Sequence, residues 1–387
     1  EATLKSRGLL KVIGEEVDRA YLSQLKKVVI NQNVIDRMAD ELQIVYTPFH
    51  GTGTVPVREG LKAIGFKNVH IVEEQAIPDP EFSTVESPNP EQHDAFELAM
   101  EAGEKLDADV LLGTDPDTDR MGVAVRHPDG EYGVLTGNQV GALLAHYIFS
   151  QKQAENRLPE NGILIKTIVT SELGRAIAEA HGVKTLDTLT GFKYIAEKIN
   201  EYEQTGAYTF LIGYEESYGY LIKDFARDKD AVQSCLLIAE VAAYYKAKGM
   251  TLYEGLIEIF ETYGFYLEGL ESLKLEGIAG AEKIEQILNT FRNEPPQSFA
   301  ERDIVMIEDY QTSQREHVET GRSETIDLPT SNVLKYILDD ESWVCLRPSG
   351  TEPLIKVYFG VKGESMAESQ SLLETLKTAV MNRVHSI

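Results

Sequence analysis

An acidic loop directly after an apolar run is the segment of this sequence with the clearest chemical potential. Residues 113–120 read Gly-Thr-Asp-Pro-Asp-Thr-Asp-Arg and place Asp115, Asp117 and Asp119 at alternating positions. Carboxylate oxygens suit Mg²⁺, which accepts few protein ligands and keeps other positions for water or phosphate. Three like charges this close repel one another unless a cation neutralises them. The spacing therefore predicts a Mg²⁺ site in which Arg120 holds a phosphate oxygen or orients an aspartate.

Three other interpretations of this acidic loop were compared with its sequence: a surface turn or helix cap, a calcium-binding loop and a phosphatase motif. An acidic surface turn or helix cap remains open. A calcium-binding EF-hand loop does not fit, because its sixth and twelfth positions would be Arg120 and Arg126, where the motif needs Gly and Glu. A phosphatase of the haloacid dehalogenase type would use Asp115 as its nucleophile, although Asp119 stands where that pattern has Thr or Val. The phosphatase is kept as an alternative.

A second loop has the composition of an anion-binding site. Residues 347–353 read Arg-Pro-Ser-Gly-Thr-Glu-Pro and lie between two apolar runs. Arg347 offers a planar fork for phosphate, Ser349 and Thr351 offer hydroxyl and N–H groups, and Gly350 permits close backbone approach. The alternative is a polar loop that two prolines stiffen.

A third loop, residues 213–220, reads Gly-Tyr-Glu-Glu-Ser-Tyr-Gly-Tyr and again follows an apolar run. Glu215 and Ser217 together are suited to pairing with neighbouring hydroxyls of a sugar. The alternative is an ordinary acidic surface loop. In open α/β sheets, ligands bind beyond the carboxyl ends of the strands, which is where the acidic loop and this loop are predicted to lie.

Alternating apolar runs and helical patterns must position these loops. Strands are predicted at residues 43–46, 69–72, 109–112, 121–125, 163–168 and 210–212, and helices at 17–30, 55–64, 91–105, 137–149, 172–180 and 231–248. This alternation indicates largely parallel sheets that helices cover on both faces. The tail differs, with predicted helices at 283–291 and 366–384 and strands at 304–307, 333–337, 343–346 and 355–359.

The predicted fold class is therefore α/β, with two similar mixed-sheet α/β domains and a smaller α+β domain that contains an antiparallel sheet. We predict the first domain at residues 1–133 with the metal loop, and the second at 134–264 with the sugar loop. The third, at 265–387, carries the phosphate loop.

Composition restricts the possible partners. The 387 residues carry a net charge of −26, which argues against nucleic acid and against an anionic membrane surface. No apolar stretch approaches the roughly 18 residues of a membrane span. Cys235 and Cys345 lie far apart in apolar surroundings and predict buried thiols in a reducing, cytoplasmic setting. A phosphate-binding site in so acidic a chain must gather its basic groups locally.

Together the three loops resemble the α-D-phosphohexomutase superfamily, and its phosphoglucomutase branch most closely. The metal loop of that family, D-x-D-x-D-R, matches residues 115–120, its sugar loop, G-E-x-S-G or a close variant, matches Glu215 and Ser217, and its phosphate loop, R-x-S-G-T-E-P, matches residues 347–353. Two further segments, 190–193 and 227–230, are also similar. The resemblance assigns these roles: metal ligands Asp115, Asp117 and Asp119; catalytic residues Arg120, Lys193 and Lys229; substrate-binding residues Glu215, Ser217, Arg227, Arg347, Ser349, Gly350 and Thr351.

The resemblance also implies an activity. Members of the family have four domains, and these residues look like the second, third and fourth. The first would carry a phosphoserine, for which no segment here qualifies; Ser87 in Ser-Pro-Asn-Pro is interpreted as part of a structural turn. The implied reaction converts glucose 1-phosphate to glucose 6-phosphate, or the mannose phosphates, through a bisphosphorylated sugar. The chain alone is expected to be inactive without that domain. A Mg²⁺-dependent phosphatase and a non-catalytic phosphosugar-binding module remain as alternatives.

Overall fold

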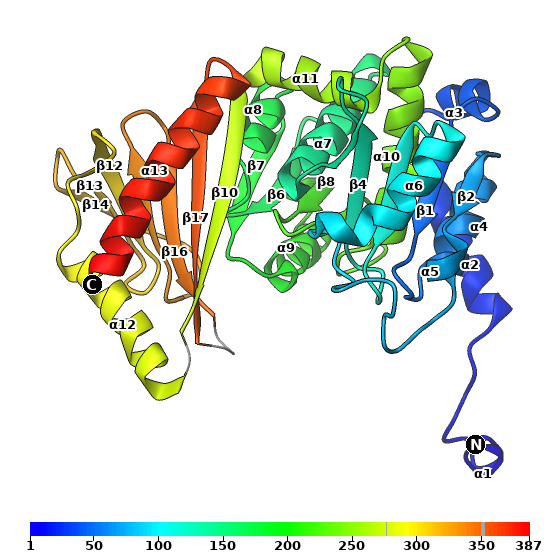
Figure 1. Ribbon diagram of the computed structural model, residues 1–387, viewed down its shortest axis with the longest axis horizontal. Coiled ribbons are helices and arrows are strands. Elements are labelled where there is room, and N and C mark those ends of the chain that lie inside the picture. The colour runs from blue at the N-terminus through cyan, green and yellow to red at the C-terminus, as the bar shows by residue number, and fades with distance from the viewer. Residues whose placement is uncertain (276, 350–352) are drawn as a thin grey trace.

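Three β-sheets lie one after another along the longest dimension of the computed structural model (Figure 1). The structure describes residues 1–275, 277–349 and 353–387. The chain passes through the sheets in sequence order, from the N-terminal sheet through a central one to the C-terminal one. Each candidate loop therefore belongs to a different sheet.

The first sheet has five strands in the order β2-β1-β3-β4-β5 and is mixed. Its strands β2, β1 and β3 are parallel, while β4 and β5 are antiparallel. The strands are β1 (Ile44–Thr47), β2 (Val69–Ile71), β3 (Val110–Thr114), β4 (Met121–Arg126) and β5 (Tyr132–Val134). The accompanying helices are α1 (Ala2–Ser6), α2 (Glu15–Leu25), η1 (Lys26–Val28), α3 (Gln32–Met38), α4 (Thr54–Ile64), α5 (Glu73–Ala76), η2 (His93–Phe96) and α6 (Glu97–Leu106).

The second sheet repeats this plan with four strands in the order β7-β6-β8-β9, of which only β9 is antiparallel. The strands are β6 (Gly162–Thr167), β7 (Lys184–Thr188), β8 (Thr209–Tyr214) and β9 (Tyr220–Leu221). The helices are α7 (Gly137–Ala154), α8 (Leu173–Ala180), α9 (Phe192–Thr205), α10 (Ala231–Ala247) and α11 (Leu252–Tyr263). Thr136 and Gln139 form a capping box at the start of α7. The side chain of each residue accepts a hydrogen bond from the backbone N–H of the other, and these two N–H groups have no partner within the helix.

The third sheet is antiparallel, in the order β10-β17-β16-β15-β12-β13-β14, with β11 paired to β12. The strands are β10 (Phe265–Lys274), β11 (Ser298–Phe299), β12 (Arg302–Asp309), β13 (Gln314–His317), β14 (Arg322–Thr325), β15 (Leu334–Leu338), β16 (Trp343–Pro348) and β17 (Leu354–Gly363). Helices α12 (Gly277–Asn293) and α13 (Met366–Ser386) pack on one face, while part of the other face packs against the second unit.

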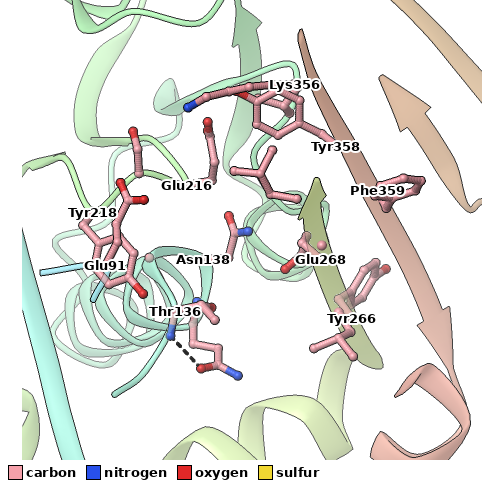
Figure 2. A pocket seen from close by; sticks show the side chains of 17 residues that line it. Glu91, Thr136, Asn138, Glu216, Tyr218, Tyr266, Glu268, Lys356, Tyr358 and Phe359 are labelled. Carbon is pink, nitrogen blue, oxygen red and sulfur yellow. Dashed lines mark hydrogen bonds between the residues drawn. The ribbon is translucent and has the colours of Figure 1, made fainter. Parts of the chain in front are cut away.

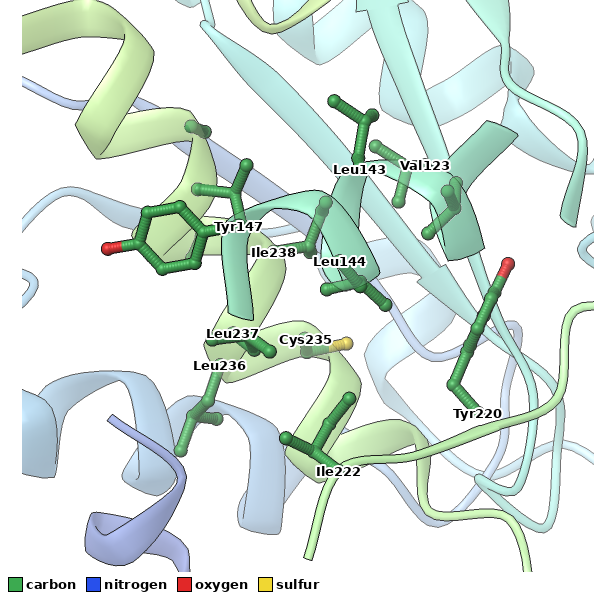
Figure 3. Close-up of a cluster of buried hydrophobic side chains, with 14 of the residues drawn as sticks. Val123, Leu143, Leu144, Tyr147, Tyr220, Ile222, Cys235, Leu236, Leu237 and Ile238 are labelled. Atoms are coloured by element: carbon green, nitrogen blue, oxygen red, sulfur yellow. The ribbon is translucent and has the colours of Figure 1, made fainter. Parts of the chain in front are cut away.

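The first two sheets share one apolar core. Leu143 and Leu144 on α7 and Leu236 and Leu237 on α10 are buried with Val123 of β4 in a single cluster (Figure 3). Because α10 is apolar on nearly every side, it can be buried between neighbours on all sides. The metal loop and the sugar loop are therefore carried by a continuous, tightly packed body.

The predicted fold class is confirmed: two mixed-sheet α/β units precede a C-terminal unit with an antiparallel sheet. Two predicted helices are shorter than expected. The helix expected at 17–30 ends at Leu25 and continues only as the 3₁₀ turn η1, and that expected at 91–105 begins at Glu97 after the turn η2. Tight 3₁₀ turns are common at helix ends. The exact domain boundaries remain a prediction. In the part of the chain that the structure describes, no helix combines the length and apolar character needed to cross a membrane.

Candidate active site

The metal loop connects β3 to β4 and brings its three aspartates together. One carboxylate oxygen from each of Asp115, Asp117 and Asp119 lies within 4.8 Å of the others. Asp115 is only 1% exposed and organises the loop, since its side chain accepts hydrogen bonds from the backbone N–H groups of Asp119 (3.0 Å) and Arg120 (2.9 Å). An oxygen-only donor set of this compactness fits Mg²⁺.

Two cations partly balance the charge of the metal loop. Arg120 Nε lies 2.7 Å from Asp115 Oδ2, and Lys229 Nζ lies 2.8 Å from Asp119 Oδ2. Burial raises the pKa of Asp115 to about 6, although its hydrogen bonds with Arg120 act in the opposite direction. Three carboxylates facing two cations leave an excess of negative charge at the loop, which favours binding of a further cation.

The sugar loop, residues 215–219, lies directly against the metal loop. Arg120 and Gly219 form an antiparallel β-bridge, and Met121 N–H donates to the carbonyl oxygen of Tyr218 (3.0 Å). A side chain at position 219 would place its Cβ 2.3 Å from Cδ of Lys229. The absence of a side chain at Gly219 therefore leaves room for Lys229 to cross the sugar loop and reach Asp119; a larger residue would displace Lys229 from this path.

Glu215 connects the sugar loop to the segment 190–193. Its side chain is 7% exposed, and its Oε1 accepts a hydrogen bond from Gly191 N–H (2.8 Å). Burial, followed by the neighbouring charge of Glu216, raises the pKa of Glu215 to about 7. Glu215 is thus a buried carboxylate that titrates near neutral pH, a property common among functional groups.

Arg347 and Ser349 of the predicted phosphate loop line a cavity between the second and third units, together with Lys193, which was predicted to be catalytic. Thr190 and Lys193 contribute from one side, and Arg347 and Ser349 contribute from the other. Arg347 Nη1 donates to the hydroxyl oxygen of Tyr358 over 3.4 Å. The cavity thus combines a lysine and an arginine from distant parts of an acidic chain. Gly350 and Thr351, also predicted to bind substrate, lie outside the described residues.

Arg227 is not brought to the other candidate residues in the part of the chain that the structure describes. Its guanidinium is exposed and pairs with Glu203 on α9 and with the carbonyl oxygen of Asp224. A contribution of Arg227 to substrate binding would need a movement of this side chain.

A second cavity lies beside the sugar loop, between the start of α7 and strands β10 and β17. Figure 2 shows Tyr218 on one side of it and Tyr358 and Phe359 on the other, with Lys356 above Glu216 in this view. Sequence reasoning assigned no role to Glu216 or Lys356. Lys356 interrupts the apolar strand β17, and a charged residue in such a strand is a signal that could have identified it.

Comparison with known proteins gives three matches to family models of phosphoglucomutase/phosphomannomutase. The α/β/α domain II model matches residues 19–130, the α/β/α domain III model matches 136–263, and the C-terminal domain model matches 299–375. A phosphoglucomutase of Staphylococcus aureus (strain MRSA252) is 43% identical over 333 residues, which is 86% of this chain. The match covers 59% of that relative, so the chain spans less than two thirds of its length.

Solved structures with a similar fold include parafusin, a phosphoglucomutase from Paramecium, in its open form. The match covers 95% of this chain and 61% of the parafusin chain, with a TM-score of 0.67 and 16% sequence identity. The N-acetylphosphoglucosamine mutase of Aspergillus fumigatus, in complex with GlcNAc-6P and magnesium, matches 95% of this chain and 71% of its own, with a TM-score of 0.55 and 16% identity. At these identities the likeness concerns the fold.

Proposed function

This chain belongs to the phosphoglucomutase/phosphomannomutase family, and we propose that it forms the metal-, sugar- and phosphate-binding parts of an enzyme that moves a phosphoryl group between two hydroxyls of one hexose. The observation that carries the proposal is the continuity of the three loops. The β-bridge between Arg120 and Gly219 links the metal loop to the sugar loop, and Lys229 of segment 227–230 pairs with Asp119. Glu215 links the sugar loop to segment 190–193, and that segment shares a cavity with Arg347.

In the proposed reaction the chain's own residues bind and orient the substrate. Arg347, Ser349 and Thr351 hold the phosphate that does not react. Glu215 accepts hydrogen bonds from sugar hydroxyls, and Ser217 accepts or donates them. Lys193 balances charge or assists proton transfer. The same contacts serve both orientations of a bisphosphorylated hexose. Glucose 1-phosphate and glucose 6-phosphate are the proposed pair, with the mannose phosphates as the alternative.

The proposed site also includes a metal ion and a phosphoserine. Mg²⁺ held by Asp115, Asp117 and Asp119 would supply positive charge against the transferring phosphoryl group. Arg120 keeps Asp115 oriented, and Lys229 balances charge or transfers a proton beside Asp119. The phosphoryl donor is proposed to be a serine outside these 387 residues, so that the chain alone is inactive.

An assay of glucose 1-phosphate with and without a phosphoserine-bearing domain placed ahead of Glu1 tests this function. We expect glucose 6-phosphate without net release of inorganic phosphate from the extended protein, and no turnover by the 387-residue chain. Release of inorganic phosphate would support the phosphatase that uses Asp115 as nucleophile. Binding without turnover in the extended protein would support a non-catalytic phosphosugar-binding module, and turnover by the chain alone would rule out an external serine.

The proposed role of Glu215 predicts a pH dependence of sugar binding. Because its pKa is about 7, its carboxylate fraction rises roughly tenfold between pH 6 and pH 8. We expect glucose 1-phosphate to bind up to about tenfold more tightly at pH 8, measured by isothermal titration calorimetry. Glu215→Gln is the matched control, since it keeps the shape but not the charge, and the difference between the two profiles removes the ligand's own titration. Parallel profiles would contradict the role.

The same shift has an opposite effect on folding. A carboxyl group whose pKa is higher in the folded than in the unfolded state binds its proton more tightly when folded. The contribution of Glu215 to stability therefore falls as the pH rises from about 4.3, the ordinary value for glutamate, to about 7. Sugar binding and folding stability should thus respond to pH in opposite directions at this residue.

A further inference from the structure

The loop that follows β6, residues 168–171, forms the joint between the second and third units. Ile168 and Val169 are buried in one apolar cluster with Cys345 of β16 and Tyr358 of β17. Nearby, the buried Lys335 Nζ donates a 2.7 Å hydrogen bond to the carbonyl oxygen of Ile168. The strands that flank the phosphate loop are therefore packed directly on this joint.

The other side of the joint is tied to the sugar loop by Glu216. The hydroxyls of Thr167 and Thr170 donate to Glu216 Oε2 over 3.1 and 3.2 Å, and the two hydroxyl oxygens lie 2.8 Å apart. Both threonines are completely buried. If this carboxylate were removed, one hydroxyl could still donate to the other, but the second would lose its acceptor, which is costly in a buried setting.

Glu216 stands in the chain between the two residues proposed to bind sugar hydroxyls. Glu215, on one side of it, accepts from Gly191 N–H, whereas Glu216 accepts from the joint. Ser217, on its other side, lines the same cavity as Glu216. Anchoring Glu216 therefore restricts the backbone positions of both neighbours.

The charge of Glu216 also faces the third unit. Burial raises the pKa of Glu216, whereas the two threonine hydroxyls and the positive charge of Arg347 act in the opposite direction. Lys356, paired with Arg347 across β16 and β17, lines the same cavity as Glu216 (Figure 2). Cations of the third unit thus lie near a carboxylate carried by the second.

We propose that Glu216 is a positioning residue that fixes the sugar loop relative to the strands carrying Arg347, through the joint at residues 168–171. The hydroxyl-binding and phosphate-binding groups then keep a constant separation, which a ligand that contacts both must match. The structural part of this proposal is independent of the enzyme's activity, whereas its ligand part rests on the proposed function.

Hydrogen–deuterium exchange of the 387-residue chain tests the structural part. We expect Glu216→Ala to speed amide exchange about tenfold at residues 167–171 and also at residues 344–347. A tenfold change in rate corresponds to the loss of about one hydrogen bond to a charged acceptor. Glu216→Gln, which keeps an acceptor oxygen, should restore most of the protection. Strand β1 at residues 44–47 serves as the internal control. Faster exchange at 167–171 alone, or at β1 equally, would overturn the coupling.

Thr170→Val provides a second, milder variant in case Glu216→Ala does not fold. It removes one donor to Glu216 and keeps the side-chain volume, so a smaller increase confined to the same two segments is expected. No increase at residues 344–347 in this variant would also overturn the coupling.

The ligand part is tested with glucose 1-phosphate, which would contact both loops, and inorganic phosphate, which would contact only the phosphate loop. We expect Glu216→Ala to weaken binding of glucose 1-phosphate about tenfold and that of inorganic phosphate less than twofold, with recovery in Glu216→Gln. Equal weakening of both ligands, or of neither, would refute the positioning role. If the unaltered chain binds no glucose 1-phosphate, the proposed function fails, and the exchange measurements alone decide the coupling.

Discussion

Replacing Asp115 with asparagine should weaken Mg²⁺ binding by about 100-fold or more, since loss of a group that only supports a metal ligand already costs about 10–100-fold. Asp115 is the buried member of the three aspartates, and it also holds the loop through the N–H groups of Asp119 and Arg120. Asparagine keeps the shape and one acceptor oxygen but removes the charge. Titration calorimetry with MgCl₂ would measure the loss directly, without any need for turnover.

A matched control for this variant is Asp129→Asn. Asp129 is an exposed aspartate in the turn before β5, and its side chain accepts a hydrogen bond only from a nearby backbone N–H in the described part of the chain. The Asp129→Asn substitution removes one negative charge from the same unit as Asp115→Asn does. It therefore controls for the general attraction of Mg²⁺ to an acidic protein. A Mg²⁺ affinity of Asp115→Asn within twofold of the control would exclude Asp115 as a ligand.

Replacing Lys166 with methionine should lower the free energy of unfolding by about 2–4 kcal/mol. Lys166 is completely buried, and its ammonium lies 3.0 Å from both Glu172 and Asp187. Burial disfavours the charge, but Asp187 and Glu172 outweigh burial and raise the pKa of Lys166. Breaking a fully buried pair costs about 3–5 kcal/mol. The expected loss is smaller because the carboxylate side chains are 26% and 32% exposed and water can reach them.

Lys198→Met is the control for this prediction. Lys198 pairs with Glu201 at 2.8 Å, yet the two side chains are 32% and 48% exposed, so its loss should cost at most about 0.5 kcal/mol. Urea unfolding followed by circular dichroism would compare the two variants at the same pH. Equal losses of unfolding free energy in the two variants would contradict the prediction. They would mean that Arg175, which already pairs with Glu172 and Asp187, neutralises these carboxylates without Lys166.

The composition of the candidate site could be predicted from sequence because its motifs are local. The three aspartates at alternating positions share one loop, and the residues of the phosphate loop are consecutive, so their proximity needs no knowledge of the fold. The fold class was predictable for a related reason. Strand and helix periodicities are properties of short segments, and their order along the chain restricts the possible sheets.

The roles of several residues could not be predicted, because they depend on contacts between distant segments. Lys229 was selected by family resemblance, and only the structure shows that its side chain crosses Gly219 to reach Asp119. Arg227 was selected in the same way, its role in substrate binding stays a prediction, and in this structure its guanidinium pairs with Glu203. Nothing in the local pattern of residues 227–230 distinguishes these two outcomes.

Local sequence patterns identify the chemical groups that this protein carries and the type of many of its helices and strands, although α9, α11, β7 and β10 were not predicted. Only the tertiary structure decided which of those groups meet, such as Glu216 with Thr167 and Thr170, and which become buried, such as Lys166. Burial and long-range contacts arise only when segments that are distant in the chain fold against one another, within one sheet unit or between units. Packing changes the surroundings of a charged group, and those surroundings set its pKa, its partners and its effect on stability.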